Sequence, residues 1–152
     1  MIRPFRPADV EGIVEVWSEA TRVAHAFLKD EFIVREERAI REEYLREADT
    51  WVWDGSGRID GFISLLGNEI GGLFVRPSIH RCGVGTALIE HALTLQESLE
   101  VEVFARNDIG RAFYRRRGFD LFREAFDARA HQPVLRLRYG AVPSPDLEEG
   151  GH

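Results

Sequence analysis

The sequence has few of the residues from which cross-linked or membrane-bound folds are built. Its 152 residues include one cysteine, Cys82, which excludes an internal disulfide and any zinc site that needs a pair of cysteines. No run approaches the roughly 20 apolar residues of a membrane-spanning helix, and the amino terminus lacks the apolar stretch of a signal peptide. We therefore expect a cytoplasmic protein with no membrane partner.

An excess of positive charge is also absent. The 26 acidic residues outnumber the 20 basic ones, so the formal net charge is -6, and we expect no nucleic-acid partner. Hydrophobic residues make up 44% and charged residues 30% of the chain, which is typical of a globular protein with a buried core. We expect one domain over residues 1–140 and a disordered tail, rich in proline, glycine and acid, over residues 141–152.

Local patterns predict a mixed α+β order of elements. Pro4 marks the first strand as an edge strand, and Asp9 is expected to cap the helix that follows. The turn "DGSG" joins two strands as a hairpin. Asn107 or Asp108 can cap the last helix, and Gly118 stands where that helix should end. The predicted order is strand, two helices, three strands, helix, strand, helix and two strands, with one strand–helix–strand crossover. The predicted strands are 2–6, 50–53, 58–66, 70–75, 99–105, 119–126 and 133–139, and the last two helices are 83–95 and 109–117.

The stretch "FVRPSIHRCGVGTALIEHAL", residues 74–93, places two glycines where a helix should begin. The first amides of a helix have no internal partner and lie at the positive end of its dipole. Gly83 and Gly85 would let the backbone approach a phosphate closely, and Arg81 would add a positive charge. The stretch therefore predicts a phosphate site. The alternative is a tight turn with close helix–sheet packing.

The residues around the glycines disfavour two common phosphate ligands. A nucleotide-binding P-loop needs a lysine after the second glycine, where Thr86 stands. A dinucleotide fingerprint needs a third glycine, where Leu88 stands, although Glu102 could act as its ribose-binding acid. Dinucleotide binding is therefore weakened but stays open.

Two motifs together resemble the GNAT superfamily of acetyl-CoA-dependent N-acetyltransferases, and in particular its small bacterial members. "VRPSIHRCGVGTAL" is similar to the family's pyrophosphate motif, a strand ending in V-x-P and then [Q/R]-x-x-G-x-[G/A] at a helix start. "NDIGRAFYRRRGF", one helix later, is similar to N-x-x-A-x-x-[F/L]-Y-x-x-x-G-F. His80 and Gly110 depart from these patterns. The order of elements from residue 1 to about 139 also fits.

The resemblance implies the fold and the cosubstrate. The fold would be a central, mostly antiparallel sheet of six or seven strands with about four helices, and one parallel strand pair would splay apart to admit acetyl-CoA. The main chain of Phe74 and Val75 would pair with the pantetheine arm, and an amide near Phe74 would polarise the thioester carbonyl. Asn107 and Phe113 would line the other side of the arm. The backbone amides that would bind the pyrophosphate are those of Arg81, Cys82, Gly83, Val84, Gly85 and Thr86.

The resemblance also implies a proton donor. Tyr114 would protonate the leaving thiolate, unless it is only an aromatic residue packed on the sheet. An amine nucleophile must lose a proton, and two residues are candidates for the base. Glu69, at a strand start, would act through water, and His25, in the first helical hairpin, would face the acceptor and titrate in the useful range. Their alternatives are a solvated acid and a satisfied histidine at a helix end.

Other clusters of reactive residues point less clearly to chemistry. We expect no metal, because the helix-start geometry opposes a site built from His80, Cys82 and His91. The run 115–117 would contact the 3′-phosphate of the coenzyme or simply complement a helix C-terminus.

The predicted activity is direct transfer of an acetyl group from acetyl-CoA to a primary amine. The acceptor, a small molecule, a peptide N-terminus or a lysine, stays open, as does the choice between monomer and homodimer. A non-catalytic acyl-CoA-binding module on the same fold is the alternative.

Overall fold

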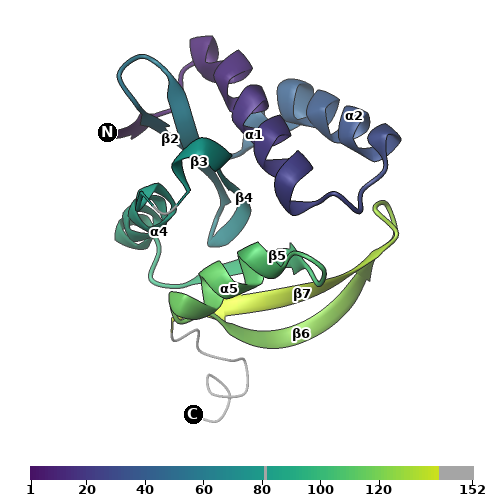
Figure 1. Cartoon of the computed structure of the whole chain (residues 1–152). Coiled ribbons are helices and arrows are strands. Elements are labelled where there is room, and N and C mark those ends of the chain that lie inside the picture. The colour runs from purple at the N-terminus through teal and green to yellow at the C-terminus, as the bar shows by residue number, and fades with distance from the viewer. Residues whose placement is uncertain (81, 141–152) are drawn as a thin grey trace.

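The computed structural model describes residues 1–80 and 82–140. The predictions made for Arg81 and for the tail 141–152 lie outside these residues. The elements follow the predicted order (Figure 1) and are β1 (Ile2–Pro4), α1 (Val10–Ala24), α2 (Asp30–Ala39), a π-helical turn (Ile40–Tyr44), α3 (Leu45–Glu47), β2 (Asp49–Asp54), β3 (Ile59–Leu66), β4 (Glu69–Val75), α4 (Val84–Leu95), β5 (Leu99–Phe104), α5 (Asp108–Arg116), β6 (Asp120–Asp127) and β7 (Gln132–Tyr139), with short 3₁₀ turns at Pro7–Asp9 and Pro77–Ile79.

The strands form one seven-stranded sheet in the order β1-β2-β3-β4-β5-β7-β6. β4 and β5 are parallel, and every other neighbouring pair is antiparallel. The predicted α+β class, the predicted sheet and the edge position of β1 are confirmed. Among the described residues, no helix is long and apolar enough to cross a membrane.

Two hydrophobic cores cover the sheet. One gathers the inner faces of α4 and α5, with Leu88 and Ala92 of α4 fully buried. The other gathers α1 and α2, with Ile13 and Val16 of α1 fully buried. Each fully buried valine, leucine or isoleucine side chain stabilises the fold by roughly 1.5–3 kcal/mol. Both cores together fix the sheet between the two helix pairs.

The parallel pair separates after two residues. In the described part of the chain the β4–β5 ladder consists of Glu69 opposite Glu100 and Ile70 opposite Val101. β4 then continues to Val75 and β5 to Phe104 without further pairing. The register of β4 against β3 shifts between Ser64 and Leu65, which leaves one residue, Gly71, as a β-bulge. We call the space that opens beyond Ile70 the β4–β5 gap. It confirms the predicted splayed pair.

Helix caps agree with the prediction in one case and differ in another. Asn107 caps α5, since its Oδ1 accepts a hydrogen bond of 2.9 Å from the amide of Gly110. Asp9 precedes α1 but makes no side-chain cap. Its carboxylate instead accepts two 2.9 Å hydrogen bonds from the guanidinium of Arg3 and one of 2.8 Å from the amide of Arg6. A bidentate arginine is the stronger partner, and it lowers the pKa of Asp9.

Candidate active site

The turn after β4 leads into the first turn of α4. The first intrahelical hydrogen bond runs from the amide of Ala87 to the carbonyl of Gly83, at 3.0 Å. The amides of Val84, Gly85 and Thr86 therefore precede the helical ladder and form the candidate phosphate site. The amide of Cys82 differs from the prediction, because it donates to the carbonyl of Ile79 at 3.2 Å.

The backbone conformation explains Gly83, and close packing within the chain explains Gly85. Gly83 has a φ of +83°, a left-handed conformation that glycine adopts without strain. A Cβ at Gly85 would lie 3.0 Å from the ring of Phe113. The tight-turn and close-packing alternative therefore explains the glycines without a ligand, and the phosphate site stays a prediction.

Phe113 brings the sequence-predicted residues together. Its ring contacts the first turn of α4 at Gly85, where Val75 also approaches, with Cγ2 3.7 Å from the same Cβ position. The guanidinium of Arg117 lies 4.1 Å from the ring centre of Phe113 and donates a 2.9 Å hydrogen bond to the hydroxyl of Thr86. The ends of β4, α4 and α5 therefore converge on one surface that carries a cation.

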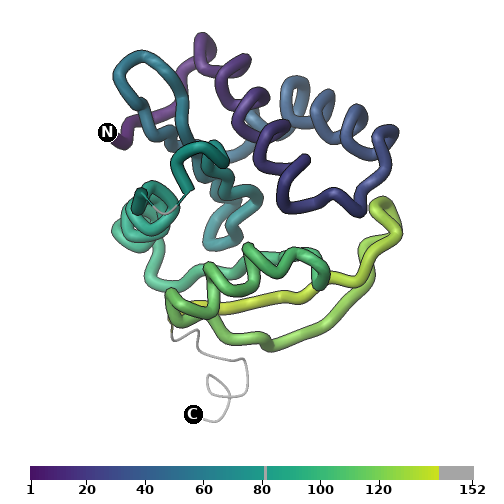
Figure 2. Tube along the Cα trace, viewed as in Figure 1, coloured from purple at the N-terminus to yellow at the C-terminus, as the bar shows by residue number. Residues whose placement is uncertain are grey.

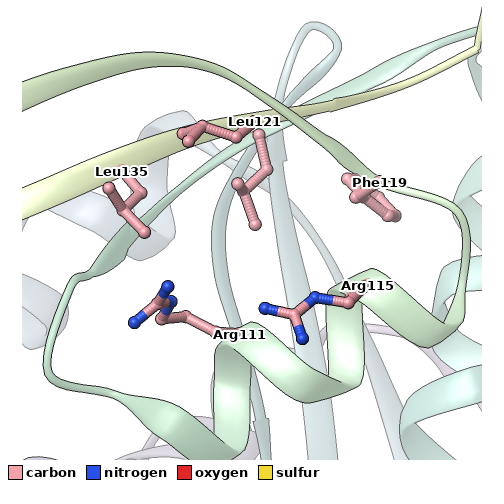
Figure 3. Close-up of a pocket in the computed structure, with 6 residues that line it drawn as sticks. Arg111, Arg115, Phe119, Leu121 and Leu135 are labelled. Carbon is pink, nitrogen blue, oxygen red and sulfur yellow. The ribbon is translucent and has the colours of Figure 1, made fainter.

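Arg115 and Arg117 of the run 115–117 point in different directions. Arg117 reaches α4, whereas Arg115 lies beside Arg111 at a cavity of about 110 Å³. Figure 3 shows these two guanidinium groups facing Phe119, Leu121 and Leu135 across that cavity, on the β6–β7 side of α5. Arg117, and not Arg115, is therefore positioned near the candidate phosphate site.

The register of β4 determines which main-chain groups face the β4–β5 gap. The amide of Arg76 donates to the carbonyl of Asp60 on β3 at 2.8 Å. Successive residues of an antiparallel ladder alternate between facing the partner strand and facing away from it. Leu73 and Val75 therefore face the gap. Phe74 faces β3, and its carbonyl oxygen lies 3.1 Å from the Cβ position of Gly61.

The gap-facing role that the resemblance gave to Phe74 therefore passes to Leu73, which sequence reasoning missed. The side chain of Phe74 packs on Phe62 instead, with ring centres 5.6 Å apart. The predicted pairing of Val75 with the pantetheine arm stays a prediction. The carbonyl of Val75 lies 3.1 Å from Nε2 of His80, which gives a structural role to the histidine that departs from the family motif.

Asn107 and Gly110 form a local pair. A Cβ at Gly110 would lie 2.9 Å from Cγ of Asn107. Glycine at the position of the usual alanine therefore leaves room for the cap. Because Oδ1 of Asn107 holds the cap, the side-chain NH₂ group is the part left to meet a ligand.

Tyr114 is 6% exposed and lies in the core beneath α5. Its ring packs edge-on against Phe113 and Phe119, at centre distances of 5.2 and 5.0 Å. Burial raises the pKa of Tyr114 well above its ordinary value, so the hydroxyl stays protonated, as a proton donor must be. The residue is packed on the sheet, and its role as acid stays a prediction.

Glu69 lies at the narrow end of the gap. Its carboxylate accepts hydrogen bonds of 2.8 and 3.1 Å from the guanidinium of Arg136 on β7, which also bonds Glu100 and Glu102. Four residues of strand, about 13 Å, separate Glu69 from Leu73. The base role of Glu69 would therefore need a chain of bridging waters, and it stays a prediction.

His25 differs from its expected titration. It is 9% exposed at the C-terminus of α1, and its ring lies edge-on against Phe27 and Phe104, 5.7 and 5.1 Å away. Burial lowers the pKa of His25 to about 4, below the range in which a base works best at neutral pH. His25 is thus a neutral aromatic residue in a wall beside the end of β5.

The surroundings of that wall are open on one side. A hollow of about 650 Å³ lies between the end of α1 and the β5–α5 junction, lined by Val23, Ala24, Ala26, Phe27, Ala105, Arg106 and Asp108. In Figure 2 the tip of the β6–β7 hairpin lies beside α2, where Arg129 forms an ion pair with Glu36.

Within residues 1–80 and 82–140, no three histidine, cysteine, aspartate or glutamate side chains are grouped to hold a metal ion.

Known proteins match this arrangement along most of the chain. A model of the acetyltransferase (GNAT) domain matches residues 46–121. The peptidyl-lysine N-acetyltransferases YiaC and YjaB of Escherichia coli are 31% and 33% identical to the chain, covering 93% and 91% of it and 98% and 95% of their own lengths.

Solved structures extend the likeness to the fold. The solution structure of apo-form YjaB from Escherichia coli has a TM-score of 0.82 at 32% identity, covering 93% of this chain and 98% of its own. The PaiA N-acetyltransferase of Thermoplasma acidophilum, solved with coenzyme A, shares the fold with a TM-score of 0.76 at 21% identity, covering 91% and 98%. With both sequence motifs, the splayed strand pair and these relatives in agreement, the chain belongs to the GNAT family of acetyltransferases.

Proposed function

We propose that this N-acetyltransferase acetylates lysine side chains of peptides or proteins. One observation carries the proposal. The β4–β5 gap opens beyond Ile70, with main-chain groups of Leu73 and Val75 facing it and the first turn of α4 at its wide end. An extended arm with a phosphate at one end fits such a gap. The acceptor class comes from the relatives named as peptidyl-lysine acetyltransferases.

The coenzyme would bind in one orientation. Its pyrophosphate would accept hydrogen bonds from the amides of Val84, Gly85 and Thr86, with Arg117 nearby as a counter-charge. Its pantetheine amides would pair with the main chain of Leu73 and Val75. The thioester would then lie toward the narrow end, where a gap-facing amide can stabilise the oxyanion.

The reaction would proceed by direct attack. The neutral lysine nitrogen attacks the thioester carbonyl carbon, the carbon–sulfur bond breaks, and the thiolate takes a proton from Tyr114. The proton lost by the nitrogen passes through water to Glu69, whose carboxylate Arg136 holds in place. Proton exchange with solvent then returns Glu69 and Tyr114 to their starting states. His25 would act as a neutral wall beside the acceptor and not as the base.

Calorimetry with coenzyme A and mass spectrometry of lysine peptides incubated with acetyl-CoA test the proposal. We expect coenzyme binding, peptide acetylation, and a large loss of turnover in Tyr114→Phe at unchanged coenzyme affinity. Self-acetylation is easily separated, because Lys29 is the only lysine of the chain. Coenzyme binding without transfer to any amine would instead favour the non-catalytic acyl-CoA module. Failure to bind coenzyme A at millimolar concentration would refute both.

A further inference from the structure

Tyr44 ends a π-helical turn that interrupts the helical segment between α2 and α3. The turn spans Ile40–Tyr44 and is followed by the buried Leu45. π-turns are rare and occur frequently at functional sites, because the extra residue redirects the side chains that follow. Tyr44 itself is half-buried.

The hydroxyl of Tyr44 lies against the main chain of β4 at the bulge. A Cβ at Gly71 would lie 2.9 Å from Cε1 of Tyr44 and closer still to its hydroxyl oxygen. Only glycine admits the ring at this point. Pairing between β4 and β5 ends one residue earlier, at Ile70 opposite Val101. The hydroxyl is therefore positioned at the narrow end of the β4–β5 gap, on the side of α2.

Three carboxylates act on this hydroxyl, and two of them, Glu69 and Glu36, are ion-paired with Arg136 and Arg129. Burial, followed by the carboxylates of Glu69, Glu36 and Glu47, raises the pKa of Tyr44. The phenol therefore stays protonated, and its oxygen keeps lone pairs that can accept a hydrogen bond. The same carboxylates that disfavour a phenolate favour an approaching ammonium group.

We propose that Tyr44 binds the acceptor amine and orients it for attack. Its hydroxyl oxygen would accept a hydrogen bond from an N–H of the lysine side chain, which leaves the nitrogen lone pair directed into the gap. Glu69, two residues before Gly71 on β4, would receive the proton through water. This inference rests on the proposed function.

The test compares Tyr44→Phe with the wild type in steady-state acetylation of a lysine peptide. Loss of one hydrogen bond to a charged or reacting group predicts a fall of roughly 10- to 100-fold in kcat/KM for the peptide. The Kd for coenzyme A, measured by calorimetry, should not change, because the hydroxyl lies at the acceptor side. A residue that merely supports β4 would alter both. Tyr139→Phe is the matched control, since that ring packs on Phe119 at a centre distance of 5.5 Å, away from the bulge.

The outcomes separate the two proposals. If the wild type binds coenzyme A but acetylates no lysine peptide, the lysine assignment is wrong and the role of Tyr44 is refuted with it. If the wild type is active and Tyr44→Phe matches its kcat/KM for the peptide, only the role of Tyr44 is refuted. Should Tyr44→Phe fold poorly, Gly71→Ala displaces the hydroxyl without removing it and should lower the same kcat/KM by a larger factor than it raises the Kd for coenzyme A; equal factors would refute the role of Tyr44.

Discussion

His25 should make the stability of the protein depend on pH in a defined window. Its pKa is about 4 in the folded protein and 6.5 in the unfolded chain. As pH falls below 6.5 the unfolded state binds a proton that the folded state does not, so folding loses free energy. The stabilisation is complete above the unfolded pKa, declines between 6.5 and about 4, and does not decline further below that.

The magnitude follows from the two pKa values. Each tenfold difference in proton affinity corresponds to about 1.4 kcal/mol, so the full loss is about 3 kcal/mol, of which about 2 kcal/mol is lost by about pH 5. Because His25 is only 9% exposed, solvent screening does not reduce this value much. Arg3 lowers the pKa of Asp9. The contribution of Asp9 to stability is therefore lost only at more acidic pH, below the ordinary aspartate pKa of 3.8. The two groups therefore act in separate windows.

Urea denaturation at about pH 7.5 and about pH 5 measures the effect. His25→Phe keeps an aromatic ring against Phe27 and Phe104 and removes the titrating group, so it should abolish most of the loss. His131→Asn replaces an exposed histidine at a positive φ of 56°, which asparagine tolerates, and should leave the loss unchanged. If wild type and His25→Phe lose the same free energy between the two pH values, the reasoning about His25 is wrong.

Five further substitutions test three other parts of the structure. Thr21 is 1% exposed and, within the described residues, its hydroxyl has no partner, so Thr21→Val should raise the free energy of unfolding by about 1 kcal/mol. Thr50→Val breaks a buried 2.8 Å hydrogen bond to Ser64 and should lower the free energy of unfolding by about 1–3 kcal/mol in the same urea titration. Arg76 is 3% exposed and donates hydrogen bonds to the carbonyl of Ile59 at 2.7 Å and to Glu15 and Asp60. Arg76→Met should therefore lower the free energy of unfolding by about 2–4 kcal/mol. It should also weaken coenzyme binding, because Arg76 holds the end of β4 before the turn. Arg117→Leu should weaken coenzyme A binding, measured by calorimetry, by about tenfold at low salt and less at high salt. Arg115→Leu, on the other side of α5, should not weaken it, and equal effects of the two variants would contradict the assigned directions.

Local patterns predicted the elements well because their causes are local. Asp54 and Gly57 of the "DGSG" turn show this, since the carboxylate of Asp54 accepts a 2.8 Å bond from the amide of Gly57, whose φ is +95°. The strand 99–105 alternates as predicted, with Leu99, Val101 and Val103 buried. The cap at Asn107 likewise spans only three residues. In each case the sequence pattern contains all the residues that make the interaction.

The candidate site was predictable only in part because its contacts are long-range. Glu69 and its partner Arg136 are 67 residues apart, and no local pattern joins them. The exchange of Phe74 for Leu73 depends on the register with β3, and a shift of one residue reverses which groups face the gap. The low pKa of His25 depends on burial beside Phe104, and the position of Tyr44 depends on a bulge in another element. Motifs predicted where the candidate site lies, and tertiary packing determines what surrounds each of its residues.

The β4–β5 gap follows from two opposing features of the same strand pair. At its narrow end, Glu69 and Glu100 lie directly opposite each other, a pair of like charges that would repel without a cation. Arg136, with a side chain that is 13% exposed, bonds both carboxylates from the neighbouring strand β7. Two residues further along, the bulge at Gly71 turns β4 away from this closed end. The arginine therefore closes the pair at the carboxylate of Glu69, the proposed base, and the glycine opens it where the thioester would lie, so that an ion-paired carboxylate and an open gap coexist within one strand.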